Sequence, residues 1–287
     1  MNAGWSAWPA PAKLNLFLHV TGRRADGYHL LQSVFMLIDW CDTLHFERRE
    51  GGAITREDLG PALPADDLVA RAARALQAAT GCPFGAHIAV HKRIPAQAGL
   101  GGGSSDAAST LLALNRLWRL GLTRVELARI GLGLGADVPF FLHGRHGWVE
   151  GIGEHVRPIG LPAARFVVVK PPQGLQTSAI FGAADLKRDC APAIISGFAA
   201  DPYGFGRNDL QPVAERLCPQ VAQGLALLAR QGLKGRMTGS GSAVFAQVPE
   251  GHAMDPGAPI RVPPDWQVRE CSNLEAHPLC GWAPDDD

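Results

Sequence analysis

The residues of this chain best suited to chemistry form a short glycine-rich stretch. Gly99–Ser105 has four glycines in its first five positions and ends in two serines. Glycine lets the backbone approach a ligand closely and point its N–H groups at anionic oxygens. The serine hydroxyls add donors or an oxygen ligand for a magnesium ion. The stretch therefore predicts a phosphate-binding loop, with a plain flexible turn as the alternative.

The flanking elements favour the phosphate-binding interpretation. Ala86–Lys92 alternates as a strand does, and Asp106–Leu120 is rich in helix formers with many apolar positions, which predicts a mostly buried helix. A helix N-terminus carries a partial positive charge that attracts anions. The loop is thus expected to join a strand to a helix whose first turn faces the phosphates.

Two common nucleotide motifs do not explain this loop. The Walker pattern requires a lysine after its last glycine, and no lysine follows Gly103. The dinucleotide pattern Gly-x-Gly-x-x-Ala occurs at Gly131, Gly133 and Ala136, but at the end of a predicted helix rather than after a strand, so we treat that match as accidental.

The remaining elements mix strands and helices. In the first half we expect strands at Lys13–Val20 and Thr43–Arg48 and a helix at Leu68–Ala79. A Thr123–Glu126 capping box predicts another helix, which ends near position 133 or 135. The second half is predicted to contain, in order, a strand at Arg165–Lys170, an amphipathic helix at Pro212–Gly232, a turn at Arg236–Gly241, a strand at Ala243–Val248, a loop at His252–Pro264 and a frayed tail after His277. We place a domain boundary near residues 155–165, which gives domains 1–158 and 159–287.

Composition narrows the class of partner. Lys plus Arg and Asp plus Glu both number 27, so net charge gives no reason to expect nucleic acid or an anionic membrane surface. The chain has no signal-like start and no apolar run of about 18 residues. Its six cysteines form no Cys-x-x-Cys pair, which is typical of reduced thiols. We expect a cytoplasmic protein, monomer or homodimer, that acts on a small molecule.

Five segments of the chain resemble a known family. Pro95–Ala108 resembles the phosphate-binding motif of the GHMP kinases, and four more segments resemble other motifs of that superfamily in the same order: Pro11–Leu18, Gly22–His29, Gly135–Phe141 and Thr238–Ser242. The resemblance implies an α/β (α+β) fold of two domains with the active site in the cleft between them. It also implies ATP and Mg²⁺ as cofactors.

The resemblance assigns two catalytic residues. Asp137 matches the family's catalytic aspartate, a base for the acceptor hydroxyl, and Lys13 matches a cation that stabilises the developing charge. Because Pro139 disfavours helix at Val138, we expect Asp137 at an irregular position that faces a cleft. Without the resemblance, Asp137 would more commonly be an aspartate that caps a turn, and Lys13 a solvated lysine at the edge of a strand.

The nucleotide site is assigned in the same way. The resemblance implies that ATP is bound by Pro95, Ala96, Gln97, Ala98, Gly99, Leu100, Gly101, Gly102, Gly103, Ser104 and Ser105. Lys92 lies just before the loop and is a candidate nucleotide contact, with an ordinary lysine at a strand end as an equal alternative. Ser105 is a candidate ligand for magnesium. Where relatives commonly have Asn before Leu near the adenine, this chain has Asp67 before Leu68. A carboxylate cannot donate as an amide does, which puts side-chain recognition of adenine here in doubt.

Other matching residues indicate the acceptor. Tyr28, His29 and Phe181 match positions that recognise cytosine, because aromatic rings stack on a base and histidine bonds its edge. Asn15 is expected to hold the polar part of the substrate, and Gly239 and Ser240 lie in a loop near it. The alternative for Phe181 is that it packs in the core. The alternative for Gly239 and Ser240 is that they form a plain hairpin turn.

The resemblance implies a kinase that phosphorylates the 2-hydroxyl of a cytidyl diphosphate sugar alcohol in non-mevalonate isoprenoid biosynthesis. Three alternatives remain: a GHMP kinase for homoserine or mevalonate, a nucleotide sensor without catalysis, and a decarboxylase on the same fold. The aromatic set argues against the first and third, and the presence of both Lys13 and Asp137 argues against the second.

Overall fold

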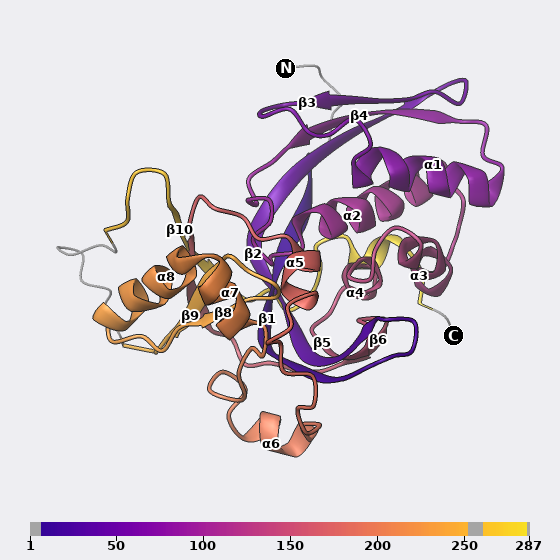
Figure 1. Cartoon of the computed structure of the whole chain (residues 1–287). Coiled ribbons are helices and arrows are strands. Elements are labelled where there is room, and N and C mark those ends of the chain that lie inside the picture. Colours follow the sequence, from indigo (N-terminus) through magenta and orange to yellow (C-terminus); the bar gives the residue numbers. More distant parts are fainter. Residues whose placement is uncertain (1–6, 252–260, 286–287) are drawn as a thin grey trace.

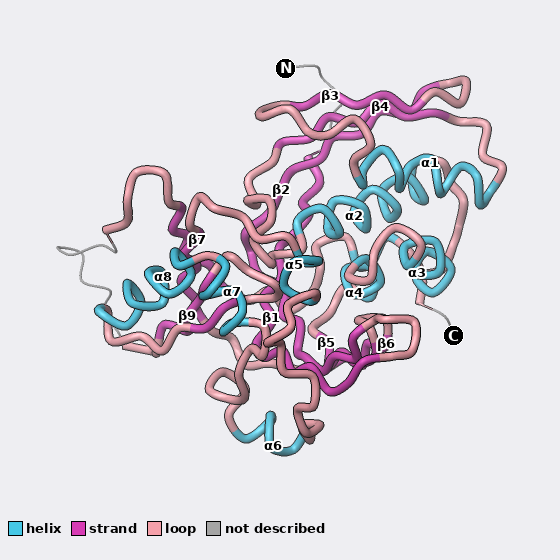
Figure 2. The backbone as a smooth tube through the Cα atoms, viewed as in Figure 1, coloured by secondary structure: helices cyan, strands magenta, loops and turns pink. Residues whose placement is uncertain are grey.

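The computed structural model describes residues 7–251 and 261–285, which form two sheets, each with its own helices (Figure 1). In the larger sheet the strand order is β3-β4-β2-β5-β6, with β1 paired to β2; only β3 and β4 run parallel. Its elements are β1 (Ala7–Arg23), β2 (His29–Arg49), β3 (Ile54–Asp58), α1 (Leu68–Thr80), β4 (Gly85–His91), α2 (Gly102–Leu117), α3 (Arg124–Leu132), α4 (Val138–His143), β5 (Gly147–Gly151) and β6 (His155–Pro158). Helices α1 to α4 lie together on one side of this sheet (Figure 2).

The smaller sheet is antiparallel, in the order β10-β7-β9-β8. Helices α7 and α8 pack beside it, whereas α5 and α6 lie on the long connection that follows β7 (Figure 1). Its elements are β7 (Arg165–Lys170), α5 (Thr177–Phe181), α6 (Ile195–Ala200), α7 (Gln211–Leu217), α8 (Pro219–Arg230), β8 (Arg236–Met237), β9 (Val244–Val248) and β10 (Gln267–Ser272), followed by a 3-10 turn at Cys280–Trp282.

Three apolar clusters hold these layers together. One fills the space between the larger sheet and α1 to α4, and a second packs the smaller sheet against α7 and α8. The third joins the two sheets, with Leu14 and Met36 from the larger sheet and Phe166, Val168 and Phe245 from the smaller one. The expected mixed α/β architecture is confirmed, and the division of domains at residue 158 stays a prediction.

Local chemistry predicted several elements closely. The strand at Arg165–Lys170 has the predicted bounds, and α1 ends one residue later than expected. Thr123 and Glu126 form the reciprocal capping box, and α3 ends at Leu132 just before Gly133. These features depend on residues close in sequence, so the pattern alone was sufficient to predict them.

The helix after the glycine loop begins earlier than predicted. Helix α2 starts at Gly102 rather than Asp106, because Gly101 takes a φ of 71° and turns the chain directly into the helix. The last two glycines and both serines therefore belong to the first turn of α2. The amides of Gly102, Gly103 and Ser104 precede the first hydrogen bond of the helix, which the Ser105 amide donates to the Gly101 carbonyl at 2.9 Å.

Two expectations about helices were wrong. Pro212–Gly232, expected to be one helix, is two, because Cys218 leaves the helical region with a φ of −140° and a ψ of 88° and Pro219 starts α8 as a separate helix. Val138 is helical despite Pro139, because Pro139 lies in the first turn of α4, where a missing N–H costs no hydrogen bond.

The tail after His277 is anchored rather than frayed. Trp282 packs edge-on against Trp8, with ring centroids 4.6 Å apart, and Leu279 is buried. The Arg124 amide donates to the Pro284 carbonyl at 3.0 Å. The predicted loop at 252–264 lies largely outside the described residues, and 261–264 form no helix or strand. None of the helices in the described part of the chain has the length and apolar character needed to cross a bilayer.

Candidate active site

A cavity of about 770 Å³ collects most of the residues that the sequence singled out. Segments distant in sequence contribute to its wall: β1, the glycine loop, the start of α4, α5 and the turn after β8. The predicted site residues that line it are Lys13, Asn15, Lys92, Pro95, Ala96, Gln97, Ala98, Gly99, Leu100, Gly101, Gly102, Gly103, Ser104, Asp137, Phe181, Gly239 and Ser240.

The glycine loop is shaped by left-handed backbone positions. Gly99 and Gly101 have φ values of 73° and 71°, a region that side chains other than glycine rarely adopt. Gly101 caps α2 without any side-chain hydrogen bond, so the first amides of that helix remain available for an anion. This arrangement suits the phosphates of a nucleotide.

Backbone hydrogen bonds tie the same loop to the smaller sheet. The amides of Ser242 and Ala243 donate to the carbonyls of Gln97 and Ala98, both at 3.2 Å. The Thr238 hydroxyl donates to the Gly99 carbonyl at 3.3 Å and accepts the Asn15 amide at 2.9 Å. The loop is thus held from both halves of the molecule.

Lys13 is buried beside the loop, with 3% of its surface exposed. Its Nζ lies 3.6 Å from Asp137 Oδ2, donates to Asn15 Oδ1 and sits 4.6 Å from the centre of the Phe35 ring. Burial lowers the pKa of Lys13, and the neighbouring Asp137 partly opposes that effect. Its backbone amide donates to Leu100 at 3.0 Å, which fixes β1 against the loop.

Asp137 stands at the N-cap of α4 without capping it through its side chain. The carboxylate is therefore free of the helix amides; it faces Lys13 and remains 32% exposed. A carboxylate beside a buried cation at the edge of a cavity can take a proton from a hydroxyl while the cation stabilises the oxygen that develops negative charge.

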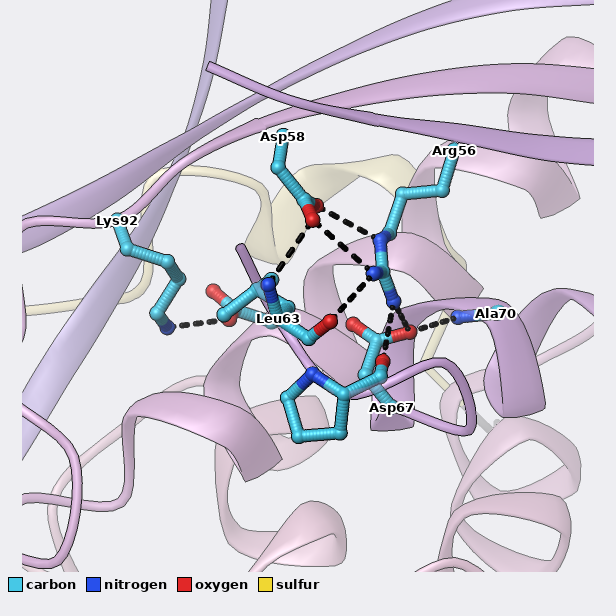
Figure 3. Close-up of polar contacts among 8 residues, drawn as sticks. Arg56, Asp58, Leu63, Asp67, Ala70 and Lys92 are labelled. Carbon is cyan, nitrogen blue, oxygen red and sulfur yellow. Dashed lines mark hydrogen bonds and ion pairs between the residues drawn. The ribbon is translucent and has the colours of Figure 1, made fainter. Parts of the chain in front are cut away.

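Lys92 lies within a buried group of charges. Its Nζ bonds to the carboxylates of both Asp42 and Asp106 (the Lys92 contact is drawn in Figure 3). Burial lowers the pKa of Lys92, but the two carboxylates outweigh it and raise the pKa above its ordinary value. Lys92 is therefore a charged side chain that lines the cavity, and the two neighbouring carboxylates already balance its charge.

The two serines differ in position. Ser104 lines the cavity, whereas Ser105 is fully buried and its hydroxyl has no hydrogen-bond partner among the described residues. The Asp106 carboxylate also lines the cavity, and its Oδ1 has no partner in the described structure. Oxygen donors for a hard cation therefore lie at the start of α2.

A second hollow of about 480 Å³ adjoins the cavity and shares Leu31, Thr177 and Phe181 with it. Tyr28 and His29 line this hollow, and Tyr28 is 60% exposed. The ring centroids of His29 and Phe181 lie 5.0 Å apart at an angle of 31°. A ligand with a flat polar ring would meet aromatic faces and one imidazole in this hollow.

Arg188, which no sequence motif indicated, organises this hollow. Its Nε donates to His29 Nε2 at 2.9 Å, and its terminal nitrogen donates to the carbonyls of Phe181 and Ala183. Burial and the charge of Arg188 lower the pKa of His29, so the ring is neutral at pH 7 with its proton on Nδ1. His29 therefore presents a donor to a ligand.

Asn208 is another residue that the sequence did not reveal. Its amide donates to the carbonyls of Met237 and Gly239, both at 2.8 Å, and so fixes the turn after β8. Ser240 in that turn shares a hydrogen bond of 2.9 Å with Thr177 of α5. Because Asn208 lies outside any motif, the sequence alone does not indicate that it fixes this turn.

Comparisons with known proteins agree with this geometry. The family models for the GHMP kinases N terminal domain and the GHMP kinases C terminal match residues 67–145 and 194–254. A 4-diphosphocytidyl-2-C-methyl-D-erythritol kinase from Paracidovorax citrulli is 65% identical over 283 residues, which is 97% of this chain and 98% of that protein. The kinase of the same name from Albidiferax ferrireducens is 66% identical over 277 residues, 96% of this chain and 95% of its own.

Solved structures show the same relationship. The crystal structure of a 4-(cytidine 5'-diphospho)-2C-methyl-D-erythritol kinase has a TM-score of 0.80 and 35% identity, and covers 93% of this chain and 99% of that one. A mevalonate kinase structure has a TM-score of 0.67 at 16% identity, with 93% of this chain and 99% of that one covered. The second similarity is one of fold alone.

Proposed function

The chain belongs to the 4-diphosphocytidyl-2-C-methyl-D-erythritol kinases within the GHMP kinases, and we propose on this basis that Lys13 and Asp137 carry its phosphoryl transfer. The reaction moves the γ-phosphoryl group of ATP to the 2-hydroxyl of 4-diphosphocytidyl-2-C-methyl-D-erythritol, a step of non-mevalonate isoprenoid biosynthesis. The observation that carries the residue assignment is that the Lys13–Asp137 pair lines the same cavity as the glycine loop, and that the aromatic hollow adjoins this cavity.

In the proposed mechanism the amides that open α2 hold the phosphates of ATP. The acceptor hydroxyl lies between Asp137 and the γ-phosphorus; its oxygen bonds to that phosphorus while the bond to the bridging oxygen of ADP breaks. Asp137 takes the hydroxyl proton, and Lys13 stabilises the charge on the oxygens. Both side chains are held in place before substrate arrives, because Asn15 and Asp137 already contact Lys13.

Magnesium is proposed to enter with the nucleotide. Asp106 and Ser104 offer oxygen ligands at the start of α2, and the described residues contain no cluster of three His, Cys, Asp or Glu side chains able to hold a metal by themselves. Mg²⁺ ordinarily keeps waters and substrate phosphates as ligands beside one or two protein oxygens, so this donor set fits it. Its charge would neutralise the phosphate oxygens during transfer.

The acceptor is proposed to lie across the cavity and the adjoining hollow. Tyr28 and Phe181 supply faces for the cytosine, and His29 donates from Nδ1 to an acceptor atom on the edge of the base. Asn15, Gly239 and Ser240 line the side nearer the reacting hydroxyl. Mevalonate and homoserine carry no base to fill this hollow.

The function is tested by direct assay of three acceptors with ATP. We expect phosphorylation of 4-diphosphocytidyl-2-C-methyl-D-erythritol and turnover of mevalonate and homoserine at least about 1,000-fold lower in kcat/KM, since each lacks the binding energy of the base. Turnover of mevalonate or homoserine without turnover of the cytidyl compound would overturn the assignment.

Replacement of Tyr28 by alanine tests the base site. The variant should raise the KM for the cytidyl acceptor about tenfold or more, because stacking on a base is worth about 1–3 kcal/mol, and leave the KM for ATP within about twofold. Tyr203→Phe is the control at the other tyrosine, because Tyr203 lies outside both cavities and its hydroxyl donates to the Pro162 carbonyl. Equal losses for both substrates in Tyr28→Ala would contradict the stacking role.

A further inference from the structure

A separate cavity of about 550 Å³ lies between β2 of the larger sheet and β10 of the smaller one. Its wall comes from Asp39, Trp40 and Cys41 of β2, from Arg93, and from residues at the start of β10. It shares no lining residue with the active-site cavity or the aromatic hollow. Lys92 lines the active-site cavity and Arg93 lines this one, so two neighbouring side chains serve different cavities.

Two guanidinium groups line this cavity from distant parts of the chain. Arg93 precedes the glycine loop and Arg269 lies on β10; both are exposed. Within the described residues neither side chain makes an ion pair or a hydrogen bond. Burial raises the pKa of the Cys41 thiol to about 11, and the charges of Arg269 and Arg93 both oppose this rise. Both guanidinium groups therefore lie near the same thiol.

The wall of the cavity carries a net positive charge. Asp39 is the one carboxylate among the described residues that line it, and its Oδ1 already accepts the Ser272 amide at 3.0 Å. Cys41 is neutral at pH 7, because its pKa lies well above that pH. Two guanidinium groups against one carboxylate favour an anion.

The frame of the cavity is fixed by backbone contacts. Trp40 Nε1 donates to the Arg93 carbonyl at 3.0 Å and so holds the segment before the glycine loop against β2. Strand β10 pairs with β7 along one edge, and the Ser272 amide points away from that edge. Because amides alternate along a strand, the Val268 amide faces the same free side. Val268 lines the cavity, so its backbone N–H is a further donor for a ligand.

Guanidinium groups bind phosphate through paired N–H donors, and a backbone amide adds a third direction of approach. We propose that this cavity is a second anion site, separate from the active site, which takes a phosphate or diphosphate group. Its volume falls within the range of about 300–1,000 Å³ that is usual for small-molecule sites, and Trp266 and Val268 give it an apolar part. The diphosphate can therefore be free or the end of a larger organic molecule.

The test titrates inorganic pyrophosphate into the chain by calorimetry, in magnesium-free buffer without ATP. We expect Arg269→Gln and Arg93→Gln each to weaken one binding event at least about tenfold, a difference of about 1.4 kcal/mol, because each removes a charged donor. Pyrophosphate held at the glycine loop would survive both substitutions. Binding unchanged within twofold in either variant, or no binding to the unmodified chain, would overturn the proposal.

Arg165→Gln is the matched control, because it removes an exposed guanidinium from β7 outside the cavity. It should bind pyrophosphate as the unmodified chain does; a loss as large as that of Arg269→Gln would reduce the effect to net charge and overturn the site. Since Arg93 and Arg269 have no partners among the described residues, their variants should keep the Tm of the unmodified chain. Pyrophosphate should raise the Tm of the unmodified chain more than that of Arg269→Gln.

A second probe distinguishes the two sources of the diphosphate. Binding of n-butyl diphosphate more than about threefold tighter than pyrophosphate, lost in Arg269→Gln, would identify the end of an organic molecule. Tighter binding of pyrophosphate would identify the free anion, and failure of both probes to bind would overturn the site. Because neither titration contains ATP or acceptor, an absence of phosphoryl transfer would overturn the proposed function and leave this site standing.

Discussion

Replacement of Asp137 by asparagine is expected to lower kcat about 1,000-fold while the affinity for ATP stays within about twofold. A positioned general base contributes about 10²–10⁴ to rate, and asparagine keeps the shape but cannot take the proton. Asp137 makes no side-chain bond to the amides of α4, so the helix does not depend on its charge. Steady-state kinetics and nucleotide titration measure the two quantities.

The matched control is Asp185→Asn, which makes the same carboxyl-to-amide change at a site 54% exposed and paired with Arg216 outside the cavity. It should keep kcat near that of the unmodified chain. If Asp137→Asn also retained near-normal kcat, Asp137 would not be the base, and orientation of the hydroxyl by other groups would have to explain catalysis.

Replacement of Gly99 by alanine should weaken ATP binding at least about tenfold and lower the free energy of unfolding by about 1–3 kcal/mol. The φ of 73° is strained for any L side chain, and an added Cβ would lie 2.1 Å from the Thr238 carbonyl oxygen. Because backbone surrounds that position, the loop must move away from the turn after β8. Denaturant titration and nucleotide binding report the two effects.

Gly133→Ala is the control for this substitution. Gly133 has a φ of −67°, and the nearest atom to an added Cβ is the Ile130 carbonyl oxygen at 3.5 Å, an ordinary contact. It should bind ATP normally. Normal ATP binding by Gly99→Ala would show that the exact path of the loop does not matter for phosphate recognition.

Sequence reasoning predicted the parts of the site that depend on neighbouring residues. The glycine cluster, the strand around Lys13 in β1 and the capping box of α3 each follow from patterns a few residues long. The resemblance to a family added Tyr28 and Asp137, and the pattern alone would have assigned Asp137 to the cap of a turn.

The rest depends on contacts between residues far apart in the chain. Arg188 reaches His29 across 159 positions, and the Thr238 hydroxyl accepts from Asn15 across 223. Asp67, whose side chain cannot donate to adenine, pairs with Arg56 and accepts the Ala70 amide. No motif in the sequence indicates the partner Arg56. Such pairs have no periodicity that a sequence pattern can display.

The backbone bonds between the glycine loop and residues 238–243 have a consequence for the order of folding. Loop closure over about 140 residues is slow compared with the formation of local helices and hairpins. In a chain emerging from the ribosome, the strands of the larger sheet and α2 are thus synthesised well before Ser242 and Ala243, whose amides fix Gln97 and Ala98. Nucleotide would then act late, as a ligand that stabilises the finished tertiary structure rather than as a template for its first half.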